Sequence, residues 1–155
     1  MSGEFDLDRI YVIVREHFRD EGHAPHYTEI AKELGVSPDE GRRALHALMD
    51  SPFPCWLHPD TDYIASFPPF SNIPTQYHIT VGGVRKWFAQ CGFEALAMCW
   101  LFRGERVVVD ALCMNSGEPM RVELRDGEVL SAEPDTIHGY VAVPFAKWRA
   151  NLPFA

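Results

Sequence analysis

The chain has 155 residues and a formal net charge of −8, with 14 Lys and Arg residues against 22 Asp and Glu. Its 46% hydrophobic and 23% charged residues exclude a disordered chain, and its length suffices for one core with a small second lobe. No apolar run approaches the roughly 20 residues of a membrane-spanning helix, and the acidic N-terminus lacks the pattern of a secretion signal. The sequence therefore predicts a cytoplasmic protein without a membrane partner, whose cysteines are thiols or metal ligands rather than disulfides.

Residues 1–67 predict three amphipathic helices followed by a small hairpin. The expected segments are helices around residues 7–18, 30–34 and 38–48, and strands at 55–58 and 63–67. The third helix has the clearest start signal, since Ser37 and Glu40 form a capping box around Pro38. This order of elements predicts a winged helix-turn-helix-like lobe.

The two halves of the chain differ in charge. Residues 1–68 carry 13 acidic and 6 basic side chains, whereas residues 69–155 carry 9 and 8. The expected recognition helix offers Arg42 and Arg43, but an acidic lobe repels a phosphate backbone. We therefore expect a packing or interaction role for this lobe and no nucleic-acid partner, and a winged-helix transcriptional regulator is the alternative that the charge disfavours.

The second lobe follows a proline-rich linker, expected at residues 68–75 without regular structure because of its three prolines. The pattern of residues 76–155 is typical of an α+β lobe. The expected segments are a hairpin at 77–81 and 84–88, a helix at about 90–102, strands at 106–112, 120–124, 128–132 and 140–143, and a terminal helix containing Trp148. These segments predict a mainly antiparallel sheet around one buried helix.

Cys91 and Glu94 are the residues whose pattern best suggests chemistry. Cys91 falls at a strand-to-helix junction, where backbone N–H groups favour a thiolate, so we expect its pKa to be lowered. Glu94 follows three residues later, about one helical turn away. A thiolate beside a carboxylic acid can hold a soft metal and transfer a proton. The alternative is that Cys91 is a small buried side chain and Glu94 a solvated charge.

The other cysteines give weaker signals. Cys99 lies eight residues beyond Cys91, about 12 Å along the expected helix, so the two thiols cannot share an ion, and we expect Cys99 and Cys55 to be core residues. Cys113 begins a turn that resembles a metal knuckle in which Ser116 replaces the second ligand. One cysteine cannot complete a tetrahedral zinc site, so we expect no stable zinc and a structural turn. The scattered histidines match no catalytic motif.

Several segments of the second lobe carry a family resemblance. They are Pro69-Phe70-Ser71-x-Ile73-Pro74-Thr75, Ile79-Thr80-Val81-x-Gly83, Trp87-Phe88-Ala89-x-Cys91-Gly92-Phe93-Glu94-Ala95-Leu96, Cys113-x-x-Ser116-Gly117-Glu118-Pro119 and Val143-Pro144-x-x-Lys147-Trp148. Together these segments resemble the alkylmercury (organomercurial) lyase family. A winged-helix lobe before the core is also that family's arrangement, so the resemblance extends over most of the chain.

The resemblance implies an activity. Members of the family cleave a carbon–mercury bond by protonolysis, in which two cysteine thiolates hold the mercury and an acid, usually aspartate, passes a proton to the leaving carbanion. Cys91 matches the first catalytic cysteine, Glu94 takes the place of the aspartate with one more methylene, and Cys113 matches a cysteine that looks structural in the family. A role for Cys113 as a second metal ligand stays open.

The resemblance also implies partners. The substrate would be a small organomercurial, no cofactor would be needed besides free thiols that accept mercury, and a thiol carrier or a mercuric reductase would receive Hg(II). The sequence stops at Ala155, a residue or two before the position expected for the second catalytic cysteine. Two hypotheses remain: a lyase of which this is a fragment, or a non-catalytic thiol protein that binds or senses mercury through Cys91.

Overall fold

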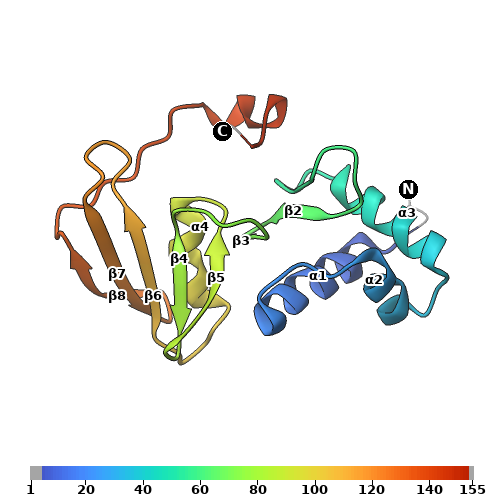
Figure 1. Cartoon of the computed structure of the whole chain (residues 1–155), viewed down its shortest axis with the longest axis horizontal. Coiled ribbons are helices and arrows are strands. Elements are labelled where there is room, and N and C mark those ends of the chain that lie inside the picture. The colour runs from blue at the N-terminus through green and yellow to red at the C-terminus, as the bar shows by residue number, and fades with distance from the viewer. Residues whose placement is uncertain (1–4, 154–155) are drawn as a thin grey trace. The chain divides into compact units, whose positions relative to one another are not determined.

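The computed structural model describes residues 5–153 of the chain. The first four residues and the last two, on which the sequence predictions also drew, lie outside this range. The fold is α+β, with three helices first and then antiparallel strand pairs, and it divides into two compact units, Met1–Pro68 and Pro69–Ala155. Figure 1 shows the elements of each unit coloured along the chain. Of the helices in the described residues, none is both long and apolar enough to cross a membrane.

The helices of the first unit begin where capping side chains are available. Their bounds are α1 Leu7–Glu21, α2 Tyr27–Leu34 and α3 Pro38–Met49. At α3 the predicted capping box is confirmed, because the Glu40 carboxylate accepts from the Ser37 N–H at 3.0 Å and the Ser37 hydroxyl accepts from the Glu40 N–H at 3.3 Å. A second box, which the sequence pattern did not indicate, begins α2 with His26 in the serine position and Glu29 as its partner.

One apolar face of each helix forms the core of the first unit. Its fully buried side chains include Ile10, Val14, Phe18, Ile30, Ala44, Leu45 and Leu48. α2 and α3 approach so closely that Gly41 has no room for a side chain. A Cβ at this position would lie 2.4 Å from the Ala31 Cβ and 2.7 Å from the Tyr27 carbonyl oxygen, so the contact between the two helices depends on glycine.

A short hairpin completes the first unit. Strand β1, Trp56–Leu57, pairs antiparallel with β2, Ile64–Phe67, as predicted. All four residues of β2 are buried, whereas a strand with one solvent-facing side would alternate between buried and exposed residues.

The second unit contains an antiparallel sheet. Within the described residues its strand order is β3-β5-β4-β6-β7-β8. The bounds are β3 Phe70–Ser71, β4 His78–Val81, β5 Val84–Ala89, β6 Val107–Leu112, β7 Pro119–Arg125 and β8 Glu128–Glu133. Gly82 and Gly83, with φ of 54° and 85°, form the two-residue turn between β4 and β5. The predicted hairpin and the predicted strands at 106–112, 120–124 and 128–132 are thereby confirmed.

Two predictions for the second unit are wrong. The supposed linker contains β3, which pairs with β5 through Phe70 and Ala89, because the prolines flank this short strand without interrupting it. Residues 140–143 form no strand. The predicted terminal helix containing Trp148 is present as a 3₁₀ helix, η2 Phe145–Ala150, and the Trp148 indole N–H donates to the Val143 carbonyl at 2.6 Å.

The helix after β5 is shorter and less buried than predicted. It comprises α4, Gly92–Ala97, continued by the 3₁₀ turn η1, Met98–Trp100, and α4 lies against β5, as Figure 1 shows. Ala95 and Met98 are fully buried, but Trp100 is 66% exposed. A helix of under two turns buries only one narrow stripe, so the predicted buried helix over 90–102 is wrong in both length and burial.

Candidate functional site

Cys91 lies where the sequence predicts, at the junction between β5 and α4. It is the N-cap residue of α4, with extended backbone angles of φ −147° and ψ 175°, and it is partly buried. The Cys91 carbonyl accepts the first helical hydrogen bond, from the Ala95 N–H at 2.9 Å. The sulfur is therefore carried at the start of the helix, on a residue whose backbone the helix holds in place.

The thiol of Cys91 is less acidic than predicted. Burial raises its pKa, and the neighbouring Glu94 carboxylate raises the pKa further, while the backbone N–H groups of Glu94 and Phe93 act in the opposite direction. The expected effect of the helix start is thus present, but burial outweighs it. The prediction of a lowered pKa for Cys91 is wrong, because the sequence does not reveal how deeply the sulfur is buried.

Glu94 is a buried carboxyl group that favours its protonated form. Burial raises its pKa from 4.5 to about 7, against a hydrogen bond from the Cys91 thiol that lowers it. The Glu94 Oε2 atom is buried and has no hydrogen-bond partner among the described residues. The alternative of a solvated surface charge at Glu94 is therefore wrong, and the carboxyl group can exist in either protonation state near neutral pH.

The Cys91 thiol and the Glu94 carboxyl group are hydrogen-bonding neighbours at the start of α4. In one state the thiol donates a hydrogen bond to the carboxylate. When an electrophilic metal takes the sulfur, the thiol proton has an acceptor beside it, and the resulting carboxylic acid can release that proton again. A thiol and a carboxyl group with a raised pKa thus lie within one turn of helix.

Cys113 lies in a different environment. It begins the predicted turn, in which the Gly117 N–H donates to the Cys113 carbonyl and the Cys113 N–H donates to the Glu118 carbonyl, both at 2.8 Å. The hydroxyl of Ser116, followed by the backbone N–H groups of Ser116 and Asn115, lowers the pKa of the Cys113 thiol. The structural turn is thus present, and it stabilises a thiolate.

Cys99 and Cys55 are core residues, as predicted. Cys99 is 1% exposed and its thiol donates to the Leu96 carbonyl at 3.1 Å. Cys99 lies in η1 beyond the end of α4, so the distance from Cys91 to Cys99 that was expected along one continuous helix does not apply. Burial raises the pKa of Cys55 to about 11. Neither thiol has the accessibility that a ligand for a small-molecule substrate needs.

A hollow of about 540 Å³ lies on the second unit but does not include Cys91 or Glu94. Its lining includes His78 and Asp110, which alternate along their strands with the buried pair Ile79 and Val109, so it lies on the sheet face opposite that pair. Within residues 5–153, no three His, Cys, Asp or Glu side chains group together as a metal site.

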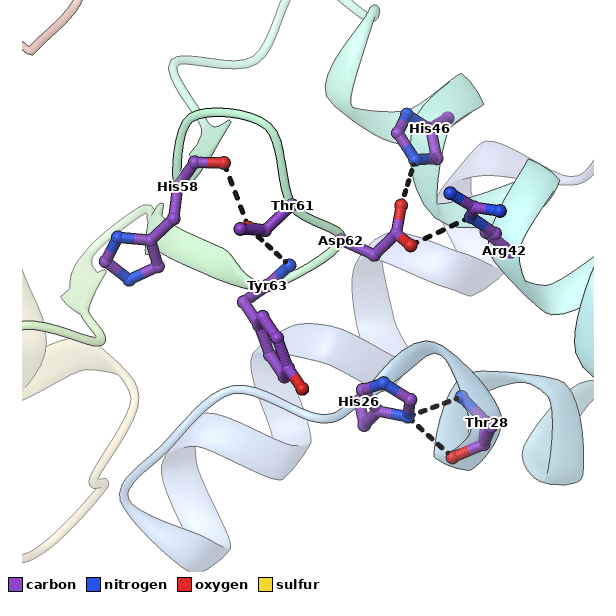
Figure 2. A network of polar contacts seen from close by, with 8 residues as sticks. All are labelled: His26, Thr28, Arg42, His46, His58, Thr61, Asp62 and Tyr63. Carbon is purple, nitrogen blue, oxygen red and sulfur yellow. Dashed lines mark hydrogen bonds and ion pairs between the residues drawn. The ribbon is translucent and has the colours of Figure 1, made fainter.

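The basic side chains of α3 make contacts within the first unit. Figure 2 shows Asp62, from the hairpin turn, facing Arg42 and His46. Its two carboxylate oxygens lie 2.8 Å from the Arg42 Nε and 2.7 Å from the His46 Nε2, and Arg43 lies over the Phe5 ring. The basic side chains with which a DNA-binding regulator would contact phosphates therefore already contact other residues of this protein.

Tyr77 is a residue near the site that no sequence motif indicated. Its phenol oxygen would lie 3.4 Å from a Cβ placed on Gly92, the residue after Cys91. The signal that could have found it is alternation, since Tyr77 precedes the fully buried Ile79 by two residues. Alternation places both side chains on the same face of the sheet.

Comparison with known proteins identifies similar sequences and similar folds. A family model for alkylmercury lyase matches residues 70–152. The alkylmercury lyases of Bacillus cereus and Clostridium butyricum are each 32% identical to the chain over 72 residues, which cover 46% of this chain and 32% of each relative. The match thus spans about a third of the length of these curated relatives.

The structural comparison extends into the first unit. The crystal structure of the mercury-bound form of MerB2 matches with a TM-score of 0.65, over 83% of this chain and 61% of that chain. The sequence identity is 23%, so this likeness is one of fold.

Proposed function

Because the chain belongs to the alkylmercury lyase family, we propose that it binds organomercurials through Cys91 and cleaves their carbon–mercury bond with a proton from Glu94. The observation that carries the proposal is the pairing of a thiol with a buried carboxyl group whose pKa is raised to about 7. The pair has the chemistry that protonolysis needs, and it lies within the segment that the family model matches.

In the first step, the Cys91 sulfur binds the mercury of R–Hg–X. The S–H bond breaks, an S–Hg bond forms, the leaving group X departs as an anion, and the thiol proton moves to the Glu94 carboxylate. Burial raises the pKa of the thiol, so this proton acceptor compensates for the scarcity of thiolate at neutral pH. Mercury is a soft metal for which thiolate is the preferred protein ligand.

In the second step, the Glu94 carboxylic acid protonates the carbon. The carbon–mercury bond breaks, its electron pair stays with carbon to form the C–H bond of R–H, and Glu94 returns to the carboxylate. The Glu94 Oε2 atom has no partner in the described residues, so a protonated carboxyl group can turn toward the substrate without breaking an existing hydrogen bond at that oxygen.

Mercury(II) then remains on Cys91. We propose that a low-molecular-weight thiol supplies the second sulfur ligand and removes the product, and that a thiol carrier or a mercuric reductase is the final acceptor. A second thiolate on mercury increases electron density on the departing carbon, so the rate of cleavage should rise with the concentration of added thiol.

For the first unit we propose a winged-helix-like scaffold that does not bind DNA. The contacts of Asp62 with Arg42 and His46 support this proposal. The excess of acidic over basic side chains in residues 1–68, 13 against 6, supports it as well.

The test uses phenylmercury acetate with excess small thiol, following benzene release and bound mercury. In a Cys113→Ser background, which removes the other accessible thiol, Cys91→Ser should abolish tight binding, because a hydroxyl is a hard and weak ligand for mercury. Glu94→Gln should retain binding and lose cleavage by about 100-fold or more, as expected for removal of a general acid. Cys113→Ser and Glu118→Gln are the matched controls and should retain both.

The same measurements separate a lyase from a protein that only binds mercury. Stoichiometric phenylmercury on Cys91 with no benzene released at any thiol concentration would establish the binding protein. Undiminished binding by Cys91→Ser in the Cys113→Ser background, or normal cleavage by Glu94→Gln, would contradict the assignment of the two residues.

A further inference from the structure

The hollow of about 540 Å³ on the second unit is crossed by a row of polar side chains. The antiparallel register pairs His78 with Asp110, Asp110 with Arg121, and Arg121 with Glu133. All four side chains line the hollow, and residues paired directly across antiparallel strands lie on the same face of a sheet. The row therefore runs over one face of the sheet, from β4 through β6 and β7 to β8.

The charges in the middle of the row compensate each other. The Arg121 Nη1 lies 2.8 Å from the Asp110 Oδ1, and the Arg121 Nε lies 3.3 Å from the Glu123 Oε1. Arg121 therefore pairs with carboxylates on β6 and on its own strand, and not with Glu133, its neighbour on β8. Among the described residues, the Glu133 carboxylate has no hydrogen-bond or ion-pair partner. One end of the row thus carries an unpaired acceptor.

The other end of the row carries unpaired donors. The Arg85 guanidinium, from β5, lines the hollow and forms no ion pair or side-chain hydrogen bond within residues 5–153. The ring of His78 contacts the Phe88 ring, with centroids 5.0 Å apart, and within the same range its nitrogens form no hydrogen bond. The hollow therefore presents donors and an acceptor at opposite ends, each available to a ligand.

We propose that this hollow binds a short free peptide, with the peptide carboxylate at Arg85 and His78 and its ammonium group at Glu133. A guanidinium is well suited to hold a carboxylate, because its N–H groups can donate in parallel to both oxygens. The Gln76 side chain also lines the hollow, and its amide can both donate to and accept from a peptide bond.

The length of the row sets the length of the ligand. Neighbouring strands lie about 4.8 Å apart, so the three steps from β4 to β8 separate the ends of the row by about 14 Å. A single amino acid is too short to contact both ends, whereas three to four extended residues span roughly 10–14 Å. The site uses neither Cys91 nor Glu94, so this inference goes beyond the proposed function and does not depend on it.

The experiment titrates the isotope-labelled chain with trialanine and follows the backbone amides by NMR. Saturable shifts should be confined to amides around the hollow, with a dissociation constant of about 1 mM, as expected for charge contacts on an open surface. N-acetyl-trialanine lacks the ammonium group, and trialanine amide lacks the carboxylate. Each should bind at least about fivefold more weakly than trialanine.

Two variants assign the two ends of the peptide. Arg85→Gln should remove the preference for trialanine over trialanine amide and keep the preference over N-acetyl-trialanine. Glu133→Gln should do the reverse. Both residues are exposed, so neither substitution should unfold the chain. Arg103→Gln and Glu128→Gln are the matched controls, since their side chains do not line the hollow, and they should retain both preferences.

Three results would overturn the inference. One is the absence of saturable shifts around the hollow at about 10 mM trialanine, tenfold above the expected dissociation constant. Another is equal affinity for trialanine and either blocked peptide. The third is an unchanged pair of preferences in Arg85→Gln or Glu133→Gln. Each of these results would leave the proposed function intact, because the mercurial measurements address Cys91 and Glu94 separately.

Discussion

Cys91 and Cys113 lie in the same unit, yet their surroundings change the two thiols in opposite directions. Cys91 is partly buried beside a carboxyl group, and its pKa is raised. Cys113 lies on a turn where the Ser116 hydroxyl and backbone N–H groups stabilise the thiolate, and its pKa is lowered. The comparison shows that burial and local hydrogen bonds set the direction of the pKa change in each thiol. Under the proposed function, the carboxyl group beside the buried thiol accepts the Cys91 proton when mercury binds.

The largest expected difference between the surroundings of Cys91 and those of Cys113 is in how they make the free energy of unfolding depend on pH. The pKa of Glu94 in the folded protein is about 7, above its ordinary value of 4.5. A carboxyl group whose pKa is raised by folding contributes full stability below pH 4.5 and loses it as the pH rises toward 7. We therefore expect the ionisation of Glu94 to lower the free energy of unfolding by about 3 kcal/mol as the pH rises from 4.5 to 7.

Urea unfolding at about pH 4.5, 6 and 8 tests this expectation. The free energy of unfolding of wild-type protein should fall across the series relative to Glu94→Gln, which cannot ionise. Glu118→Gln changes the carboxylate that accepts from the Ser116 hydroxyl near Cys113 and should track the wild type. Parallel pH profiles for wild type and Glu94→Gln would show that the Glu94 carboxyl group is not desolvated.

The sequence predicted most elements of the fold but not their burial. Helix starts were predictable where a capping side chain is present, as at Ser37. The turn at Gly82 and Gly83 was predictable because its backbone conformation favours glycine. β3 was missed because two residues are too few for alternation to be seen, and proline composition suggested the opposite. Strand pairing between Phe70 and Ala89 is a long-range contact that no local pattern encodes.

The candidate site was predictable in position and not in electrostatics. The junction of strand and helix located Cys91, and helical spacing placed Glu94 beside it. The direction of the Cys91 pKa depends on burial by parts of the chain distant in sequence, so the local argument from the helix start was wrong. Tyr77 was missed for the same reason, since its contact with Gly92 joins segments that the sequence separates by a hairpin.

A smaller difference is expected in alkylation by iodoacetamide at about pH 7, which requires thiolate but no metal. Cys113 should be modified at least about tenfold faster than Cys91, since it has more thiolate at this pH. Mass spectrometry of the modified peptides assigns the rates to each cysteine. Faster modification of Cys91 would show that the helix start outweighs burial. Methylmercury should instead react faster with Cys91 than with Cys113, because the Cys91 proton can pass to Glu94 when mercury binds.

The smallest effect should come from Ser116, whose single hydroxyl contributes to the difference between the two thiols. The Ser116 side chain is the first cause of the lowered pKa of Cys113, and its single O–H can alternatively donate to the Glu118 carboxylate, whose oxygen lies 3.0 Å away. Ser116→Ala should slow alkylation of Cys113 at neutral pH by about two- to fivefold, since the turn's backbone N–H groups remain. Cys91 in the same sample serves as the internal control, and its rate should not change. An unchanged Cys113 rate would mean that the backbone of the turn alone stabilises the thiolate, and the contrast between the two cysteines would then rest on burial at Cys91 and on turn geometry at Cys113.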